Sequence, residues 1–142
     1  MKKLELILQN KGKKIIQASP DSTVYEALGI MMEFNISAIL ITEGNKLKGI
    51  FTERDYARKV VLKGKSSKEV KLREVMTPTP LTVTPDDSVE FCMETMTEKH
   101  IRHLPVVENG EPTGMISIGD VVKFVIEDQK HTIRSLENYI SS

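Results

Sequence analysis

Two aspartates of the chain occur in the same local pattern, three positions after a hydroxyl residue: Thr52 precedes Asp55, and Ser117 precedes Asp120. This pattern is typical of a helix N-terminus, where a fixed carboxylate and backbone amide groups lie close together. A carboxylate accepts hydrogen bonds from two neighbouring sugar hydroxyls, while the amides favour phosphate. Such a turn can therefore hold a sugar with its acid and approach a phosphate with its amides, although either pair alone could simply be a capping box.

The segments around the two aspartates repeat along the chain. Asp55 and Asp120 lie 65 positions apart, and residues 20–55 return without a gap as residues 85–120. A gapless repeat of this length indicates two supersecondary units rather than a solenoid of short repeats. We expect the two units to pack around a pseudo-twofold axis, with the ligand sites in the cleft between them.

Each copy has the pattern of a β-α-β-β-α unit, which predicts an α/β (α+β) fold. Residues 13–18 and 80–84 are rich in β-branched side chains, and each is followed by a helix with a capping-box pattern, Thr23-x-x-Glu26 or Asp87-x-x-Glu90. A hairpin and a second helix follow in each copy. The predicted segments are an N-terminal helix and lead-in at 1–13, unit one at 14–63, a linker at 64–76, unit two at 77–127 and a C-terminal helical extension at 128–142.

Composition narrows the possible functions. The 20 basic and 20 acidic residues balance, and no apolar run approaches the roughly 20 residues of a membrane span. The single cysteine, Cys92, excludes an internal disulfide, so we expect a cytoplasmic protein without membrane contact. The basic stretch from Arg58 to Arg73 is either a solvated linker or a patch that attracts phosphate. It lacks interleaved aromatic residues, so we expect no nucleic-acid binding.

Four fragments carry a more specific signal: GIFTERD at 49–55, VMTP at 75–78, IRHLPVV at 101–107 and GMISIGD at 114–120. In this order on a duplicated frame they resemble the CBS domain family, in which two such units form a Bateman module. The resemblance runs from Lys14 to about Ile126 and is greatest to small stand-alone CBS-pair proteins. It implies two units packed sheet to sheet, with adenine nucleotides bound between them.

The resemblance also implies which residues bind the nucleotide. In the family, basic residues at the start of the central strand reach toward phosphate, and here Arg102 and His103 stand where the first copy has Ser37 and Ala38. We therefore expect a stronger first site and a weaker second one. The first site comprises Ile16, Ser37, Ala38, Thr52, Arg54, Asp55, Arg102 and His103, and the second comprises Thr77, Pro105, Ser117, Gly119 and Asp120.

The leading hypothesis is a regulatory, energy-sensing module that binds AMP, or ATP, ADP or NAD, and signals occupancy to an unknown partner protein. The alternatives are an S-adenosylmethionine sensor and a ligand-independent adaptor. No activated nucleophile or phosphate-cradling GxxxxGK[ST] loop is present, so we expect no enzyme activity. His100 and His103 have no convincing third ligand, so no metal is expected. The family also implies a homodimer, a disc of four CBS units.

Overall fold

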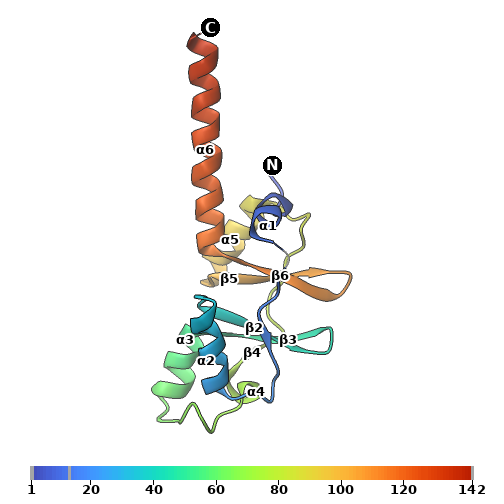
Figure 1. The fold of residues 1–142 in the computed structure, drawn as a ribbon, viewed down its shortest axis with the longest axis vertical. Helices are drawn as coiled ribbons and strands as arrows, with labels where there is room; N and C mark the ends of the chain where they lie inside the picture. The colour runs from blue at the N-terminus through green and yellow to red at the C-terminus, as the bar shows by residue number, and fades with distance from the viewer. Residues whose placement is uncertain (1, 13, 142) are drawn as a thin grey trace.

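The computed structural model describes residues 2–12 and 14–141, which form two similar halves and a long C-terminal helix (Figure 1). Met1, Lys13 and Ser142 lie outside the described residues, and with them parts of the predicted segments 1–13, 13–18 and 128–142. The mixed α+β class predicted from the sequence is confirmed, as are the two tandem units.

The first unit contains β1 (Gln17–Ala18), α2 (Val24–Glu33), β2 (Ala38–Glu43), β3 (Lys46–Thr52), α3 (Glu53–Asp55) and the π-helix η1 (Tyr56–Val61). Its sheet is completed by β4 (Thr77–Pro78), in the order β1-β2-β3-β4, with β1 and β2 parallel and the other neighbours antiparallel. The predicted capping box starts α2, where Thr23 and Glu26 accept each other's backbone amides.

The second unit repeats this arrangement with α5 (Val89–Lys99), β5 (His103–Glu108), β6 (Glu111–Ser117) and α6 (Ile118–Ser141). The β5-β6 hairpin turns at Asn109 and Gly110, whose φ angles are 52° and 79°. Positive φ at both central residues suits the right-handed twist of a hairpin and explains the Asn-Gly pair.

Two details of the second unit differ from the prediction. The expected strand at 80–84 is reduced to a single parallel bridge between Val83 and Val106. The helix cap is Ser88, whose Oγ accepts the amide of Phe91 at 3.0 Å, so the predicted cap at Asp87 is wrong. Asp87 instead accepts the backbone amide of Thr84 at 2.8 Å and closes the preceding turn. Two adjacent polar residues can both act as caps. Because the Asp87 carboxylate is engaged in the turn, Ser88 caps the helix.

The two sheets face each other across a small apolar layer. Ala38, Leu40 and Ile50 of the first sheet are buried there, with Met115 of β6 packed against them. Matching hydrogen bonds occur on the two sides: Glu53 N donates to Ser37 O, and Ile118 N donates to Arg102 O. Because these bonds are related by the 65-residue repeat, the hairpin and the helix that follows it are arranged alike in the two units, as a pseudo-twofold relation requires.

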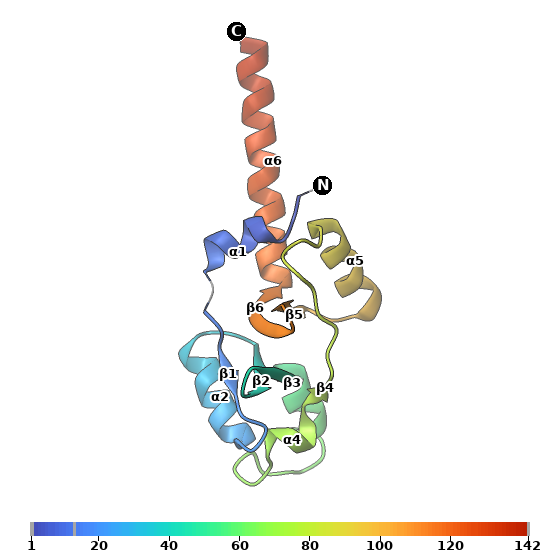
Figure 2. The same ribbon diagram turned by 90° about the vertical axis from the view of Figure 1, so that its right-hand side faces the viewer.

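The segments that enter each unit are exchanged between the halves. Helix α1 (Glu5–Lys11) lies beside α5 and α6 of the second unit, whereas α4 (Leu72–Val75) lies on the first unit (Figure 2). Leu4 and Ile7 are buried in the core of the second unit. The backbone pairings correspond: Val24 N donates to Val70 O, and Val89 N donates to Lys2 O.

Helix α6 extends far beyond the body of the protein (Figure 1). Val121 is its buried residue, whereas Val122, Ile126, Ile133, Leu136 and Ile140 are exposed. The beginning of α6 packs through Phe124 and Val125 against the second core, which contains Leu4 and Ile7.

Candidate functional site

The first candidate site is centred on Asp55, at the end of the short helix α3. Asp55 Oδ2 accepts the backbone amide of Thr52 at 3.0 Å and its hydroxyl at 3.2 Å, while Thr52 Oγ1 accepts the amide of Asp55 at 3.1 Å. The other carboxylate oxygen, Oδ1, lies 3.1 Å from Lys59 Nζ. The side chain is 13% exposed, so the carboxylate is held rigidly but still reaches solvent.

Lys59 comes from the π-helix η1 and also donates to Val75 O at 3.1 Å. The repeat places Phe124 at the equivalent position of the second unit, so this lysine belongs to the first site alone. π-Helical turns are frequent at functional sites, and here the turn brings a cation to Asp55.

The second candidate site is centred on Asp120 in the first turn of α6. Asp120 Oδ2 accepts the backbone amide of Ser117 at 2.8 Å, and Ser117 Oγ accepts the amide of Asp120 at 3.1 Å. Lys11 Nζ also contacts this oxygen at 2.7 Å and donates to Met115 O at 2.6 Å. The second carboxylate thus has the same cap as the first, with a lysine from a different element.

The start of β5 brings the two units together. His103 Nε2 lies 3.1 Å from Ser37 Oγ, as the predicted first site requires of these two residues. Arg102 is exposed, and its backbone carbonyl accepts the amide of Ile118. Arg54 is exposed and donates to His100 O at 3.0 Å, so its guanidinium links α3 to the end of α5.

The remaining predicted residues lie on the surrounding strands and turns. Ala38 and Pro105 are buried within β2 and β5, and Ile16 packs against the first core just before β1. Thr77 is exposed on β4, opposite Ile50. Gly119 is exposed between Ser117 and Asp120. The hydrogen bonds and ion pairs of the two carboxylates are made with Thr52, Lys59, Ser117 and Lys11 instead.

Two titratable groups near the second carboxylate have shifted pKa values. Burial is the main cause that lowers the pKa of His103 from its ordinary value of 6.5, and the charge of Lys11 adds to it, so the imidazole is neutral at pH 7. Burial alone would raise the pKa of Asp120. The hydrogen bonds from Lys11 and Ser117 outweigh it and hold that pKa below 3.8. The carboxylate is therefore charged throughout the neutral range.

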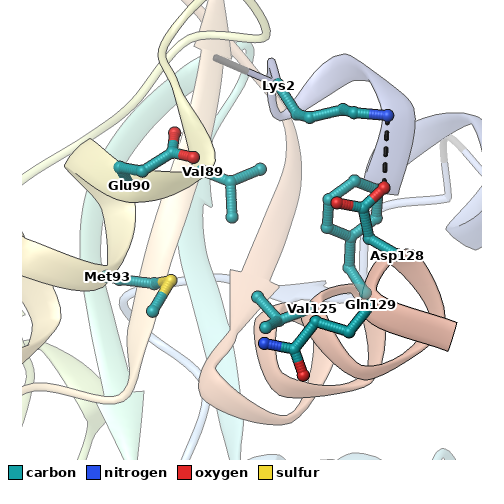
Figure 3. Close-up of a pocket in the computed structure, with 8 residues that line it drawn as sticks. Lys2, Val89, Glu90, Met93, Val125, Asp128 and Gln129 are labelled. Carbon is teal, nitrogen blue, oxygen red and sulfur yellow. Dashed lines mark ion pairs between the residues drawn. The ribbon is translucent and has the colours of Figure 1, made fainter. Parts of the chain in front are cut away.

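A separate hollow of about 250 Å³ lies between α5 and α6, shown in Figure 3. It contains none of the predicted nucleotide-binding residues. Lys2 and Asp128 form an ion pair of 3.2 Å at its rim. Its lining consists of Lys2, Val89, Glu90, Met93, Phe124, Val125, Asp128 and Gln129.

Metal-ligand clusters and membrane-spanning helices are both absent from the described residues, 2–12 and 14–141. These residues contain no group of three or more His, Cys, Asp or Glu side chains arranged to hold a metal ion. In the same part of the chain, no helix has both the length and the apolar character needed to cross a membrane.

Sequence reasoning missed both lysines. Lys59 stands four positions after Asp55, and this spacing was a usable signal for an ion pair. Lys11 is 109 positions from Asp120, and no local pattern connects them. The contact depends on the packing of α1 against the second unit.

Comparisons with known proteins agree with this architecture. The family model described as CBS domain matches residues 12–62 and 72–127. The mitochondrial CBS domain-containing protein CBSX3 of Arabidopsis thaliana is 38% identical over 143 residues, which cover 94% of this chain and 69% of that protein. Two longer plant proteins, CBSCBSPB5 and CBSCBSPB4, are 38% identical over 120 residues, and the chain spans 21% of their length.

Solved structures show the same likeness. A protein with CBS domains from Burkholderia ambifaria has a TM-score of 0.85 and 45% identity, covering 89% of this chain and 96% of that one. The CBS domain pair of protein MJ0100, solved in complex with 5′-methylthioadenosine and S-adenosyl-L-methionine, has a TM-score of 0.77 and 26% identity. It covers 87% of this chain and 98% of the other.

Proposed function

Because the chain belongs to the CBS domain family, we propose that it is a regulatory module that binds an adenosine-containing nucleotide at two sites between its units. CBS domain pairs are regulatory modules, and the MJ0100 pair binds adenosyl compounds. The observation that carries the proposal is the matched pair of capped carboxylates, Asp55 and Asp120, in the first turn of the helix that follows each hairpin.

Each carboxylate suits a ribose. A charged acceptor that is already oriented by a backbone amide loses little freedom when it accepts two neighbouring hydroxyls. Asp55 presents Oδ1 and Oδ2 with Thr52 on one side and Lys59 on the other. In the first site the phosphate would lie toward Arg102 and His103, with the base or the sugar near Ser37 and Ala38.

AMP is the proposed ligand, with ATP, ADP and NAD as related candidates. Its single phosphate matches the Arg102 guanidinium and the neutral His103 imidazole at the start of β5 and needs no metal to bind. S-adenosylmethionine is the second candidate, because the MJ0100 domain pair was solved with that compound. The two ligands share adenosine and differ in charge, so titration distinguishes them.

The test is calorimetric titration of the chain with AMP, ATP, NAD and S-adenosylmethionine, repeated on Asp55→Asn and Asp120→Asn. Loss of a charged acceptor should raise the dissociation constant about ten- to a hundredfold. We expect the larger loss of affinity for the Asp55 variant. Asp86→Asn is the matched control, because Asp86 is also acidic but 82% exposed. If neither site variant changes the affinity for any ligand, the assignment of the ribose is wrong.

The signalling step requires that ligand binding favours one arrangement of the protein over another. We propose that the chain forms a homodimer through α6 and that this interface responds to ligand binding. Its exposed Val122, Ile126, Ile133, Leu136 and Ile140 follow spacings of 4, 7, 3 and 4, which fit the seam of a coiled coil. Sedimentation equilibrium should give a dimer that Ile133→Glu dissociates and Ser135→Glu, on another face, does not. A wild-type monomer at micromolar concentration would contradict it.

Three earlier expectations stay predictions. The absence of enzyme activity is checked by incubating the chain with AMP, ATP or NAD and following product. A cytoplasmic location is the second, and the similar CBSX3 protein is named as mitochondrial. A regulated partner protein also belongs to the proposal.

A further inference from the structure

The lysine at the second carboxylate comes from an element outside the 65-residue repeat. In that repeat, Asp55 and Asp120 correspond, but Lys59 corresponds to Phe124 and Lys11 has no equivalent cation. The two sites therefore receive their ammonium groups from unrelated parts of the chain.

The position of Lys11 follows from the lengths of α1 and α4, the helices of the two segments that enter the units, here called the entry segments. Lys3 pairs with Ser88 as Lys71 pairs with Thr23, so the entry segments correspond at a spacing of 68 rather than 65 positions. Helix α1 has seven residues and α4 has four. The additional turn carries Lys11 past the equivalent end of α4 and into contact with Asp120.

Helix α1 is anchored in the second unit, so the backbone position of Lys11 is fixed. Leu4 is fully buried and Ile7 is 6% exposed in the second core. Leu8 lies in van der Waals range of Gly114, 3.7 Å from the position of a Cβ there. Gly12, with a φ of 88°, ends the helix directly after Lys11. The Cα of Lys11 is thus held in one position. The Lys11 side chain is 39% exposed, so its ammonium group can change direction.

The ammonium competes with a sugar for the same acceptor. Lys11 Nζ occupies Asp120 Oδ2, the oxygen that also accepts the Ser117 amide. A ligand that brings only a ribose must share this carboxylate with the lysine. A ligand that also carries a phosphate offers the ammonium a second anion within reach of its flexible stem.

We propose that Lys11 is the specificity-determining residue of the second site: it pairs with Asp120 and turns to the phosphate of a bound nucleotide, so this site favours phosphorylated over neutral or cationic adenosine ligands. The inference rests on the proposed function and extends it. It also supplies the phosphate partner that the sequence did not reveal for this site. A sulfonium ligand such as S-adenosylmethionine would place a second cation near Lys11 and is disfavoured there.

The test uses the full chain with Asp55→Asn to weaken the first site, titrated with AMP, adenosine and S-adenosylmethionine. Adding Lys11→Met removes the charge and keeps most of the stem. We expect AMP to bind about tenfold more weakly, whereas adenosine and S-adenosylmethionine bind as well or better. Lys11→Arg should keep most of the preference for AMP. Lys3→Met is the matched control, since its pair with Asp86 spans 3.4 Å and is exposed.

The outcomes separate the two proposals. If Lys11→Met changes the affinities for AMP and adenosine by the same factor, Lys11 has no selective role and the inference is overturned. If the Asp55→Asn chain binds no ligand while the wild type does, the second site is not a nucleotide site, which also overturns it. If the wild type binds none of the three ligands, the proposed function itself fails.

Discussion

The pair between Lys11 and Asp120 makes a prediction about stability that requires no ligand. The hydrogen bonds and the charge of Lys11 help to hold the pKa of Asp120 below its ordinary value. A carboxyl group with a lowered pKa in the folded state stabilises the fold above its unfolded pKa. That contribution is lost as the pH falls through the folded value. Lys11→Met should therefore destabilise the protein at pH 7 and progressively less below about pH 4.

The size of the effect follows from the exposure of the pair. Lys11 is 39% exposed and Asp120 25%, so water screens the attraction, although the remaining carboxylate is partly buried. We expect a loss of about 1 kcal/mol at pH 7, near the upper end for exposed pairs. For a chain of this size that is a decrease in melting temperature of roughly 3 °C.

Urea unfolding at pH 7 and pH 3, followed by circular dichroism, measures the difference. Lys3→Met should change the free energy of unfolding by less than about 0.5 kcal/mol at either pH, because its pair is longer and both partners are exposed. If Lys11→Met is equally destabilising at pH 7 and pH 3, the lysine acts through its apolar stem rather than its charge. The electrostatic reasoning would then be refuted.

Two further predictions concern the half-buried His103 and the buried Cys92 of the second unit. The pKa of His103 is lowered, chiefly by burial, so the unfolded chain takes up a proton at a higher pH than the folded chain. The free energy of unfolding should therefore fall as the pH drops below about 6.5, and His103→Gln should make this fall smaller. Thermal unfolding between pH 7 and pH 5.5 measures this, and equal slopes would contradict it. Burial raises the pKa of Cys92 to about 11, so a thiol reagent at pH 8 should label it only as fast as the chain opens. Labelling within seconds in the absence of urea would show an accessible thiol.

The two hairpins illustrate what the sequence predicted well. Their strands occur where β-branched and apolar residues flank Gly44 and the Asn109-Gly110 pair, and the glycines adopt φ angles of 62° and 79°. Turn chemistry is local, so a single sequence contains it. The carboxylates Asp55 and Asp120 were likewise predictable as capping residues, because a helix start and its cap lie within four positions.

The short first strands were predicted less well. Residues 80–84 have the composition of a strand, yet Val83 makes only one bridge, to Val106. Val83 N donates to Pro105 O, and Val107 N donates to Val83 O. Side-chain composition indicates whether a segment is suited to a strand. The number of residues that pair depends on the path of the neighbouring strand.

The origin of the two site lysines shows why the sites could be predicted only in part. Lys59 follows Asp55 on one helical segment, whereas Lys11 reaches Asp120 because α1 docks on the distant unit. Gapless comparison at 65 positions cannot find the second relation, since the entry segments correspond at 68. A repeat fixes the internal geometry of each unit but places no restraint on the length of the segment that enters it. The longer α1 keeps Leu4 and Ile7 in the core of the second unit, and its last residue gives one carboxylate a cation from outside its own unit. Variation in entry-segment length is therefore a route by which two sites of one fold can acquire different ligand preferences without any change in the units themselves.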